Sequence, residues 1–397
     1  MTNRYDKVVC AGMDVHKNFS SVTFRGIRGN IVARERLEHP NRGRLYERLR
    51  QWPPKIPVIL EASFGWGWIS DILTEVGLDP HLANCFKVDK MREARGWPKT
   101  NGKDADLLST LSQEATNWWE VWLAPPEVRD RREWMRYRMG LVALGTETQN
   151  RIHAVLHRHG IFHGFSDLFG KAGREFLVNL CRDGKTKDAQ LPDGAWAALS
   201  GHVRLLNRLR MELAQIAKRL RKELERSELA RRLDSIPGFG LILSHVLMAE
   251  IGQIERFHSN GALAQYSLLA PKVSDTGEAD PTEAPKGRKL GKRGNHALKW
   301  AFIEAARGAV RRGGKWRAMF NRHTDGGKKN RNRGYIKVAR ELVKVAYVVW
   351  RKKVEYTDRP PQRPGRQIDE SGSTRSGTGQ FNKAMTVAQQ LGPQVSS

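Results

Sequence analysis

The first part of the chain alternates short apolar runs with polar turns, a pattern typical of β-strands. VVCAGMDV and SSVTFRG, over about residues 7–25, are separated by the polar turn HKNF, and PVIL follows at residues 57–60. A helical pattern comes after PVIL, HLAN at 81–84 is a further candidate strand, and another helix is expected after KTNGKD. These segments predict an α/β layer that ends near the APPE turn.

Apolar positions in the middle of the chain recur at helical spacing among many arginines. One long amphipathic helix is expected over about 127–159 and a second over about 196–229. The pair is compatible with an antiparallel coiled-coil arm and equally with an ordinary helical core. The second helix is expected to bury one face made of Leu205, Leu209, Leu213, Ile216 and Leu220.

The last third of the chain begins with a tight turn, IPGFG, between two helical segments. A helix-hairpin-helix phosphate contact and a purely structural turn both fit it. A Gly-, Pro- and Lys-rich loop spans 271–293, and the helices ALKWAFIEAARGAV and GYIKVARELVKVAYVVWRKK follow. Beyond them the chain holds too few apolar residues to fold. The predicted order is therefore an α/β domain, a helical arm, a mainly α-helical domain and a disordered tail, at 1–125, 126–230, 231–356 and 357–397.

The net charge of the chain indicates a class of binding partner. The 69 Lys and Arg residues outnumber the 42 Asp and Glu residues, which leaves a net charge of +27 and favours a polyanion. No apolar stretch approaches the roughly 20 residues of a membrane span, and the N-terminus lacks a signal-peptide pattern, so a cytoplasmic protein with no membrane partner is expected. No cysteine lies in a CxxC pair, so packing roles are expected for Cys10, Cys85 and Cys181.

Three acidic residues carry the candidate chemistry. Asp14 and Glu61 interrupt apolar, strand-like runs, where a carboxylate is costly unless it is paired or holds a cation, and Asp104 lies where a helix begins. Carboxylates on strand ends and a helix start can hold the divalent ions of phosphoryl transfer. Taken singly, each residue is better explained as a turn residue or a helix cap. Their order along the chain favours the metal site.

Lysine, arginine and glycine are concentrated in two later segments, PKGRKLGKRGNHALKW and GGKWRAMFNRHTDGGKKNRNRGYIKVAR. This composition is typical of phosphate binding. Trp316 and Tyr335 interleave with the cations and are candidates for stacking on bases, whereas Trp300 is expected in the core because it shares helical spacing with Ile303 and Ala306. The nucleic-acid-binding residues predicted here are Lys286, Arg288, Lys289, Lys292, Arg293, Lys328, Lys329, Arg331 and Arg333.

An ordered series of blocks resembles the DEDD-type insertion-sequence transposases of the IS-one-ten family. The N-terminal blocks are GMDVHKNFSSVTF, VILEASFGWG, KTNGKDADLLS and RYRMGLVALGTETQNRIHAVLHRHGI. The C-terminal blocks are LDSIPGFGLILSHVLMAEIGQIERF, ALAQYSLLAPKVSDTGE and KLGKRGNHALKWAFIEAARGA. Together they cover most of the chain up to about residue 355.

The resemblance implies a RuvC-like, ribonuclease-H-type N-terminal domain with four metal ligands and Mg²⁺ as cofactor. By position the ligands are Asp14, Glu61, Asn101 and Asp104. Asn101 is a neutral oxygen ligand, which weakens binding of a divalent ion, and Asp106 is a substitute whose helical direction differs. Two nearby lysines, Lys99 and Lys103, are expected to contact phosphate.

The resemblance also implies a hydroxyl nucleophile in the C-terminal domain. Spacing from Pro271 puts Thr276 at the position of the family's serine, and Ser274 is the nearby alternative. Without the resemblance, both residues are best explained as turn residues that bond their own backbone.

The implied function is a transposase or recombinase that cleaves and transfers DNA strands at the ends of its element and at a target. The implied assembly is a homo-oligomer, a dimer or tetramer, in which one protomer's acidic domain meets another's hydroxyl domain. Some members are guided by a structured RNA. Two alternatives stay open: a catalytically degenerate nucleic-acid-binding relative, because of Asn101 and Thr276, and a structure-selective, junction-resolving nuclease.

Overall fold

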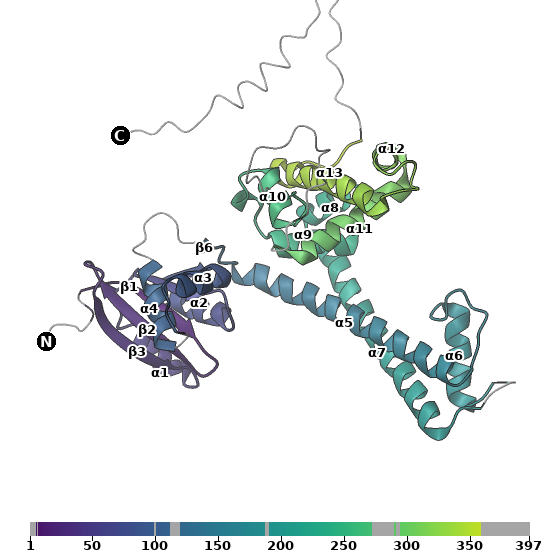
Figure 1. Ribbon diagram of the computed structural model, residues 1–397, viewed down its shortest axis with the longest axis horizontal. Coiled ribbons are helices and arrows are strands. Elements are labelled where there is room, and N and C mark those ends of the chain that lie inside the picture. Colours follow the sequence, from purple (N-terminus) through teal and green to yellow (C-terminus); the bar gives the residue numbers. More distant parts are fainter. Residues whose placement is uncertain are drawn as a thin grey trace, which may run out of the picture. The chain divides into compact units, whose positions relative to one another are not determined.

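The computed structural model describes residues 5, 7–98, 101–111, 120–186, 190–271, 290 and 294–358 (Figure 1). Contacts divide the chain into Met1–Glu355 and a separate C-terminal segment, Tyr356–Ser397. The tail for which disorder is predicted lies outside the described residues from 359 onward. Within the described part, no helix is both long enough and apolar enough to cross a membrane.

The N-terminal domain is built on a mixed six-stranded sheet with the order β3-β2-β1-β4-β5-β6. The first three strands pair antiparallel, β4 and β5 extend the sheet in parallel from β1, and β6 closes the edge antiparallel to β5. The strands are β1 Val8–Val15, β2 Phe19–Gly26, β3 Ile31–Glu38, β4 Pro57–Glu61, β5 Asp79–Ala83 and β6 Glu120–Val121.

Every strand expected from the apolar runs is present. The short edge strand β6 was not predicted, and neither was β3. Its sequence, IVARERLE, buries only Ala33 and Leu37. As an edge strand it exposes its other face, so charged residues interrupt its pattern. Tertiary pairing with β2 therefore decides that this segment is a strand.

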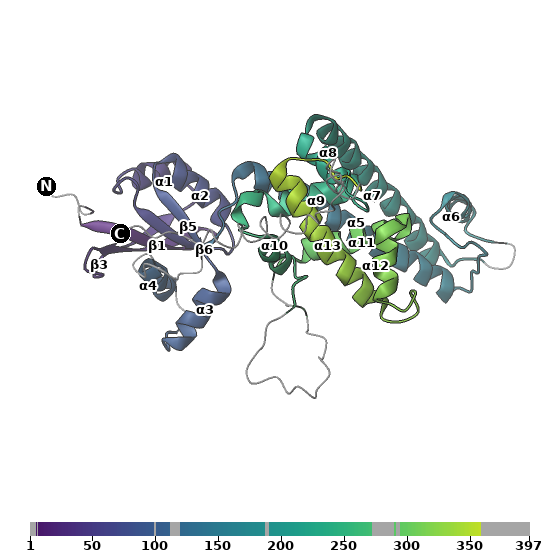
Figure 2. The ribbon, with the colours of Figure 1, turned by 90° about the horizontal axis from the view of Figure 1, so that it is seen from above.

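Helices flank the sheet, as Figures 1 and 2 show. They are α1 Arg42–Leu49, α2 Trp66–Glu75, α3 Cys85–Ala94 and α4 Asn101–Leu111. Leu107, Leu108 and Leu111 of α4 form one buried cluster with Ile59 of β4. A mixed sheet with flanking helices is confirmed, and it is consistent with a ribonuclease-H-like fold.

Two long helices occupy the middle of the chain, α5 Pro126–Arg158 and α7 Asp193–Arg226, and they pack along each other. At their far ends they bury a shared core with α6 Lys171–Asp183, a helix that was not predicted. The predicted buried face of α7 is partly wrong: Leu205 is 48% exposed and its neighbour Leu206 is buried instead. Leu206 belongs to the core shared with α6, whereas Leu209, Ile216 and Leu220 are buried as predicted.

The C-terminal region is mainly helical, as predicted. Its elements are α8 Glu228–Asp234, α9 Leu241–Ile251, η1 Ile254–Arg256, α10 Asn260–Tyr266, α11 His296–Arg312, α12 Gly314–Arg322 and α13 Arg331–Lys352. The IPGFG turn joins α8 to α9. Gly238 in this turn has φ +87°, and a Cβ there would lie 1.9 Å from the Ala305 carbonyl oxygen of α11. The glycine is therefore required for close packing of the turn on α11.

The expected roles of two tryptophans are reversed. Trp300 is 39% exposed, so its predicted core position is wrong, whereas Trp316 of α12 is only 4% exposed. The buried face of α11 runs through Leu298, Phe302 and Ala305, and Trp300 falls outside it. A buried Trp316 side chain cannot stack on a base, which removes it as a candidate contact.

Candidate active site

Two of the predicted acidic residues lie next to each other at the ends of neighbouring parallel strands. Met13 of β1 pairs with Leu60 of β4, and Asp14 and Glu61 are the next residue of each strand. Residues in register on parallel strands project from the same face of the sheet. The Asp14 side chain is 11% exposed, so its carboxylate is held in a largely desolvated position.

Helix α4 covers this same face, and Gly12 lets it approach. A Cβ at Gly12 would lie 2.1 Å from the Ser109 backbone nitrogen and 2.4 Å from the Ala105 carbonyl oxygen. Because residues two apart on a strand share a face, Asp14 lies on the face that α4 covers. Asp104 is in the first turn of α4, directly before Ala105.

The three carboxylates thus come from β1, β4 and α4 and belong to one side of the sheet. Among the described residues, no three His, Cys, Asp or Glu side chains are gathered closely enough to form a metal-binding cluster. Carboxylate oxygens are nevertheless the ligands that Mg²⁺ prefers. The donor chemistry therefore fits a divalent cation. Asn101, the fourth predicted ligand, is the first residue of α4.

Each carboxylate has basic or polar neighbours. Asp14 Oδ2 lies 3.0 Å from His16 Nε2, an ion-pair distance without hydrogen-bond geometry. Asp104 Oδ1 lies 3.9 Å from Arg92 Nε of α3. An imidazole and a guanidinium therefore lie beside two of the acids.

Cys85, at the start of α3, contacts Glu61. Its thiol donates to the Ala62 carbonyl oxygen at 2.9 Å and lies beside the Glu61 carboxylate. Burial, followed by the negative charge of Glu61, raises the pKa of the Cys85 thiol to about 11. Cys85 is therefore a neutral thiol at physiological pH and is not a nucleophile.

Asp106, the possible substitute for Asn101 as a ligand, is bonded to other side chains in the structure. Its carboxylate accepts hydrogen bonds from Thr23 at 2.8 Å and from Arg34 Nε and Nη2 at 3.0 and 2.9 Å. Burial would raise the Asp106 pKa, but the bonds from Arg34 and Thr23 outweigh it and the pKa lies below its usual range. Asp106 ties α4 to β2 and β3, which holds Asp104 in place.

Sequence comparison identifies the two halves of the chain separately. Residues 11–161, which include Asp14, Glu61 and Asp104, match the DEDD-type family model of IS110, described as a transposase. Residues 230–321 match a second model, described as the transposase IS116/IS110/IS902 family. The two matches together span more than half of the chain. The chain belongs to the IS110 family of transposases.

Individual relatives agree with this assignment. The transposase for insertion sequence element IS1328 of Yersinia enterocolitica is 24% identical over 310 residues, which is 76% of this chain and 83% of the relative. The insertion element IS110 uncharacterized 43.6 kDa protein of Streptomyces coelicolor is 24% identical over 67% of this chain and 74% of its own. The insertion element IS116 uncharacterized 44.8 kDa protein of Streptomyces clavuligerus is 26% identical over 36% of this chain and 34% of its own.

Several predicted site residues of this IS110-family chain lie outside the described residues. They are Ser274, Thr276, Lys99, Lys286, Arg288, Lys289, Lys292 and Arg293. The two ends of the loop that carries most of them are described. Pro271 and Leu290 form an antiparallel bridge, and Asn295 donates its backbone N–H to the Tyr266 carbonyl at 2.8 Å. The Asn295 side chain also donates to buried Glu250 at 2.8 Å, which fixes the loop where α11 begins.

The remaining predicted cations are exposed. Lys103 lies in the first turn of α4 with its ammonium 5.3 Å from the centre of the Trp97 ring. The others, Lys328, Lys329, Arg331 and Arg333, occupy the turn between α12 and α13 and the start of α13. Burial first, and then Lys337, Arg322 and Arg333, lower the pKa of nearby His323, as expected of a positive surface. Tyr335 packs on Phe320 with ring centres 4.6 Å apart.

Two features of the structure were missed from the sequence. Phe64, three residues after Glu61, is 75% exposed, which is unusual for a large aromatic residue and suits stacking on a base. A run of cations on α7 lines a groove against α5. Phe64 lies in the turn before α2, and the α7 cations lie on the polar face of an amphipathic helix, so residue spacing alone does not distinguish either feature.

Proposed function

We propose that this protein is a divalent-metal-dependent DNA transposase that cleaves and rejoins strands at the ends of its own insertion element and at a target. The observation that carries the proposal is the placement of Asp14 and Glu61 on adjacent parallel strands, on the face covered by α4 with Asp104. A desolvated carboxylate on a strand is costly, and a bound cation would offset that cost.

In this proposal Asp14, Glu61 and Asp104, with Asn101 as a neutral fourth donor, hold the metal. A bound Mg²⁺ would supply Lewis-acid polarisation of the scissile phosphate. His16, Arg92 and Lys103 retain the phosphate beside the carboxylates. The proposed nucleophile is the hydroxyl of Ser274 or Thr276: its oxygen forms the new bond to phosphorus, a DNA oxygen leaves, and the serine or threonine carries the strand as a phosphoester until a new DNA hydroxyl displaces it.

The partners proposed are DNA and further copies of this chain, in a dimer or tetramer that brings a carboxylate domain to a hydroxyl loop. A structured guide RNA is a further proposed partner, supported by the family resemblance and by the net charge of +27. The ribonuclease-H-like class of the first domain, the coiled-coil character of α5 and α7, and a phosphate contact at the IPGFG turn belong to the same proposal.

A covalent adduct tests the proposed chemistry. The full chain is incubated with the DNA that flanks its element and with Mg²⁺, and a denaturation-resistant protein–DNA adduct is mapped by mass spectrometry. The adduct is expected on Ser274 or Thr276, and Asp14→Asn should abolish it while the exposed Glu38→Gln leaves it unchanged. An adduct elsewhere refutes the nucleophile assignment. Nicking that survives changing both hydroxyl residues to alanine indicates a junction-resolving nuclease.

Metal binding is tested without any activity measurement. Mn²⁺ or Mg²⁺ should raise the melting temperature of the wild type, because a ligand that binds only the folded state stabilises it. Asp14→Asn should abolish that rise, and Glu38→Gln should keep it.

The neutral residue Asn101 favours a second candidate, a relative that binds nucleic acid without catalysis. Restoring the acid with Asn101→Asp distinguishes the two. Cleavage by the wild type supports the transposase, and DNA binding with no cleavage even by Asn101→Asp supports the non-catalytic protein.

A further inference from the structure

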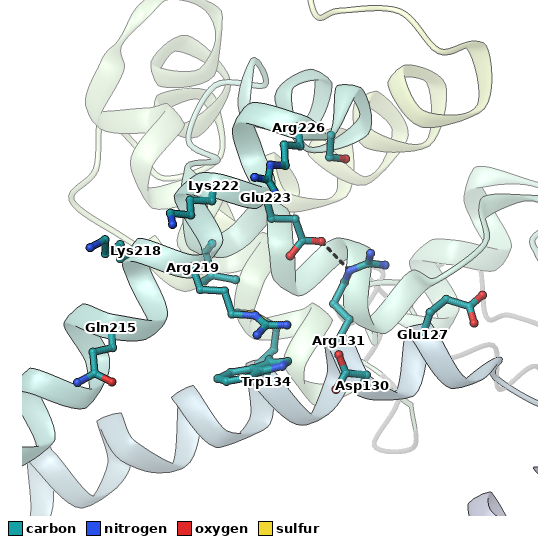
Figure 3. Close-up of a pocket in the computed structure, with 13 residues that line it drawn as sticks. Glu127, Asp130, Arg131, Trp134, Gln215, Lys218, Arg219, Lys222, Glu223 and Arg226 are labelled. Carbon is teal, nitrogen blue, oxygen red and sulfur yellow. Dashed lines mark hydrogen bonds and ion pairs between the residues drawn. The ribbon is translucent and has the colours of Figure 1, made fainter.

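A groove with a volume of about 770 Å³ lies between α5 and α7, and none of the proposed metal ligands lines it (Figure 3). Its α7 wall carries Lys218, Arg219, Lys222 and Arg226, and its α5 wall carries Arg131 and Trp134. We call this the α5–α7 groove. Concave surfaces lined by one sign of charge concentrate ligands of the opposite charge.

The cations of the α7 wall are exposed and are not neutralised by ion pairs. Over the residues that the structure describes, no carboxylate forms an ion pair with Lys218, Lys222 or Arg226. By contrast, the exposed Arg208 of the same helix is paired one turn away with Glu212 at 2.9 Å. The positive charges of the α7 wall are therefore available to an anionic ligand.

The acidic residues of the groove do not cancel this charge. Glu223 is bonded to Arg131 at 3.2 Å, drawn as the dashed line in Figure 3, and its other oxygen lies 3.8 Å from the buried His245 ring. Glu127 and Asp130 line the α5 side. The positive potential is thus concentrated on the α7 wall.

The spacing of the cations suits a regular polyanion. Lys218, Lys222 and Arg226 are four residues apart, which is about 6 Å along a helix axis. Phosphates follow one another at about 3.4 Å along the axis of a stacked strand, so successive cations reach about every second phosphate. Within the groove, the Arg219 guanidinium of α7 lies 4.2 Å from the centre of the Trp134 ring of α5. This cation–π pair places an aromatic ring and a guanidinium, two groups on which bases stack, beside the row of cations.

We infer that the α5–α7 groove binds the phosphodiester backbone of a nucleic-acid strand. The inference rests on the proposed function, since a transposase must hold nucleic acid, and it adds a binding surface separate from the carboxylates. Backbone contacts of this kind hold a strand without reading its sequence. DNA and RNA share this chemistry, and the assay below compares them.

The test uses a triple variant, Lys218→Gln, Lys222→Gln and Arg226→Gln, in the full chain. The control changes three exposed, ion-paired cations in the same way: Arg151→Gln, Arg182→Gln and Lys344→Gln. Fluorescence anisotropy measures binding of a labelled 20-nucleotide DNA strand, the same sequence as RNA, and the DNA duplex. EDTA is present, so failure of the metal chemistry leaves this measurement unaffected.

The triple variant should bind at least one of the three probes about tenfold more weakly. The slope of the logarithm of the binding constant against the logarithm of salt concentration should become shallower by about 2 for a single strand or about 3 for a duplex. The control should match the wild type. The probe with the larger loss identifies whether the groove takes DNA or RNA. Trp134→Leu should weaken the same probe and leave the salt slope unchanged, because it removes stacking and no charge.

Three results would overturn the inference. One is unchanged affinity and salt slope for every probe in the triple variant, with circular dichroism showing that it is folded. Another is an equal loss in the control, which would mean that only net charge matters. The third is a change in oligomeric state, measured by light scattering, with probe binding intact, which would make the groove an interface between copies of this chain.

Discussion

Replacing Gly12 with alanine should unfold the N-terminal domain more easily and displace the helix that carries Asp104. Gly12 lies in the middle of β1, directly under α4. The added Cβ would lie 2.1 Å from the Ser109 nitrogen, 2.4 Å from the Ala105 oxygen and 2.7 Å from the Leu108 carbonyl carbon. All three are backbone atoms, so no rotamer change can relieve the contact, and α4 must shift as a unit.

The expected cost follows from these distances. Overpacking a core by one methyl group costs about 1–3 kcal/mol, and three contacts well under 3 Å place Gly12→Ala at the upper end, about 3 kcal/mol. For a domain of this size, each kcal/mol lowers the melting temperature by a few degrees, so a decrease of about 10 °C is expected. The proposed Mg²⁺-dependent cleavage should fall as well, since Asp104 moves relative to Asp14.

Gly102→Ala provides the matched control. Gly102 is in the same helix, and a Cβ there meets nothing within 4 Å. Alanine in a helix is favoured over glycine by about 1 kcal/mol, so this variant should be neutral or more stable. Unfolding is followed by calorimetry on both variants and the wild type. If Gly12→Ala melts with the wild type, the close approach of α4 to β1 is wrong, and so is the common face for the three carboxylates.

Other consequences of the site are testable in the same way. Because the pKa of Asp106 is lowered in the folded protein, its carboxylate stabilises the fold above its unfolded pKa of about 3.8, and this stabilisation is lost as pH falls through the folded pKa. Asp106→Asn should lower the free energy of unfolding by about 1–3 kcal/mol at pH 7 and flatten the acid limb of a stability–pH curve. Because the pKa of Cys85 is about 11, iodoacetamide should modify this thiol at pH 8 about a hundredfold more slowly than a thiol with the ordinary pKa of 9.0. A modification rate equal to that of a model thiol would contradict the Glu61 contact. Phe64→Ala should leave the melting temperature unchanged and weaken binding of single-stranded DNA by about 1–3 kcal/mol, as measured by anisotropy. Unchanged binding would show that this exposed ring is not used for stacking.

The local sequence pattern was sufficient to predict a strand or helix wherever the residues of that segment alone decide its structure. The apolar runs around Asp14 and Glu61 predicted β1 and β4, and the leucines after Asp104 predicted α4. The long helices α5 and α7 followed from their apolar spacing. The spacing of apolar residues in a buried strand or an amphipathic helix depends on which of its faces are buried, so these elements could be predicted from the sequence.

The faces of those elements were less predictable. Trp300 and Leu205 fit a helical stripe by spacing, yet both are exposed. Which stripe is buried depends on which neighbour packs against it, and α6 and α12, the neighbours concerned, were not recognised. The edge strand β3 was missed for the same reason, because pairing with β2 makes it a strand.

The sequence by itself determined the chemistry of this protein: its carboxylates, its hydroxyl candidates, its excess of cations and its family. Only the tertiary structure decided that Asp14 and Glu61 are adjacent in register, that Asp106 is occupied by Arg34 and Thr23, and that the α7 cations face Trp134 across a groove. Residue types set which bonds are available, whereas contacts between segments distant in sequence set which of those bonds form.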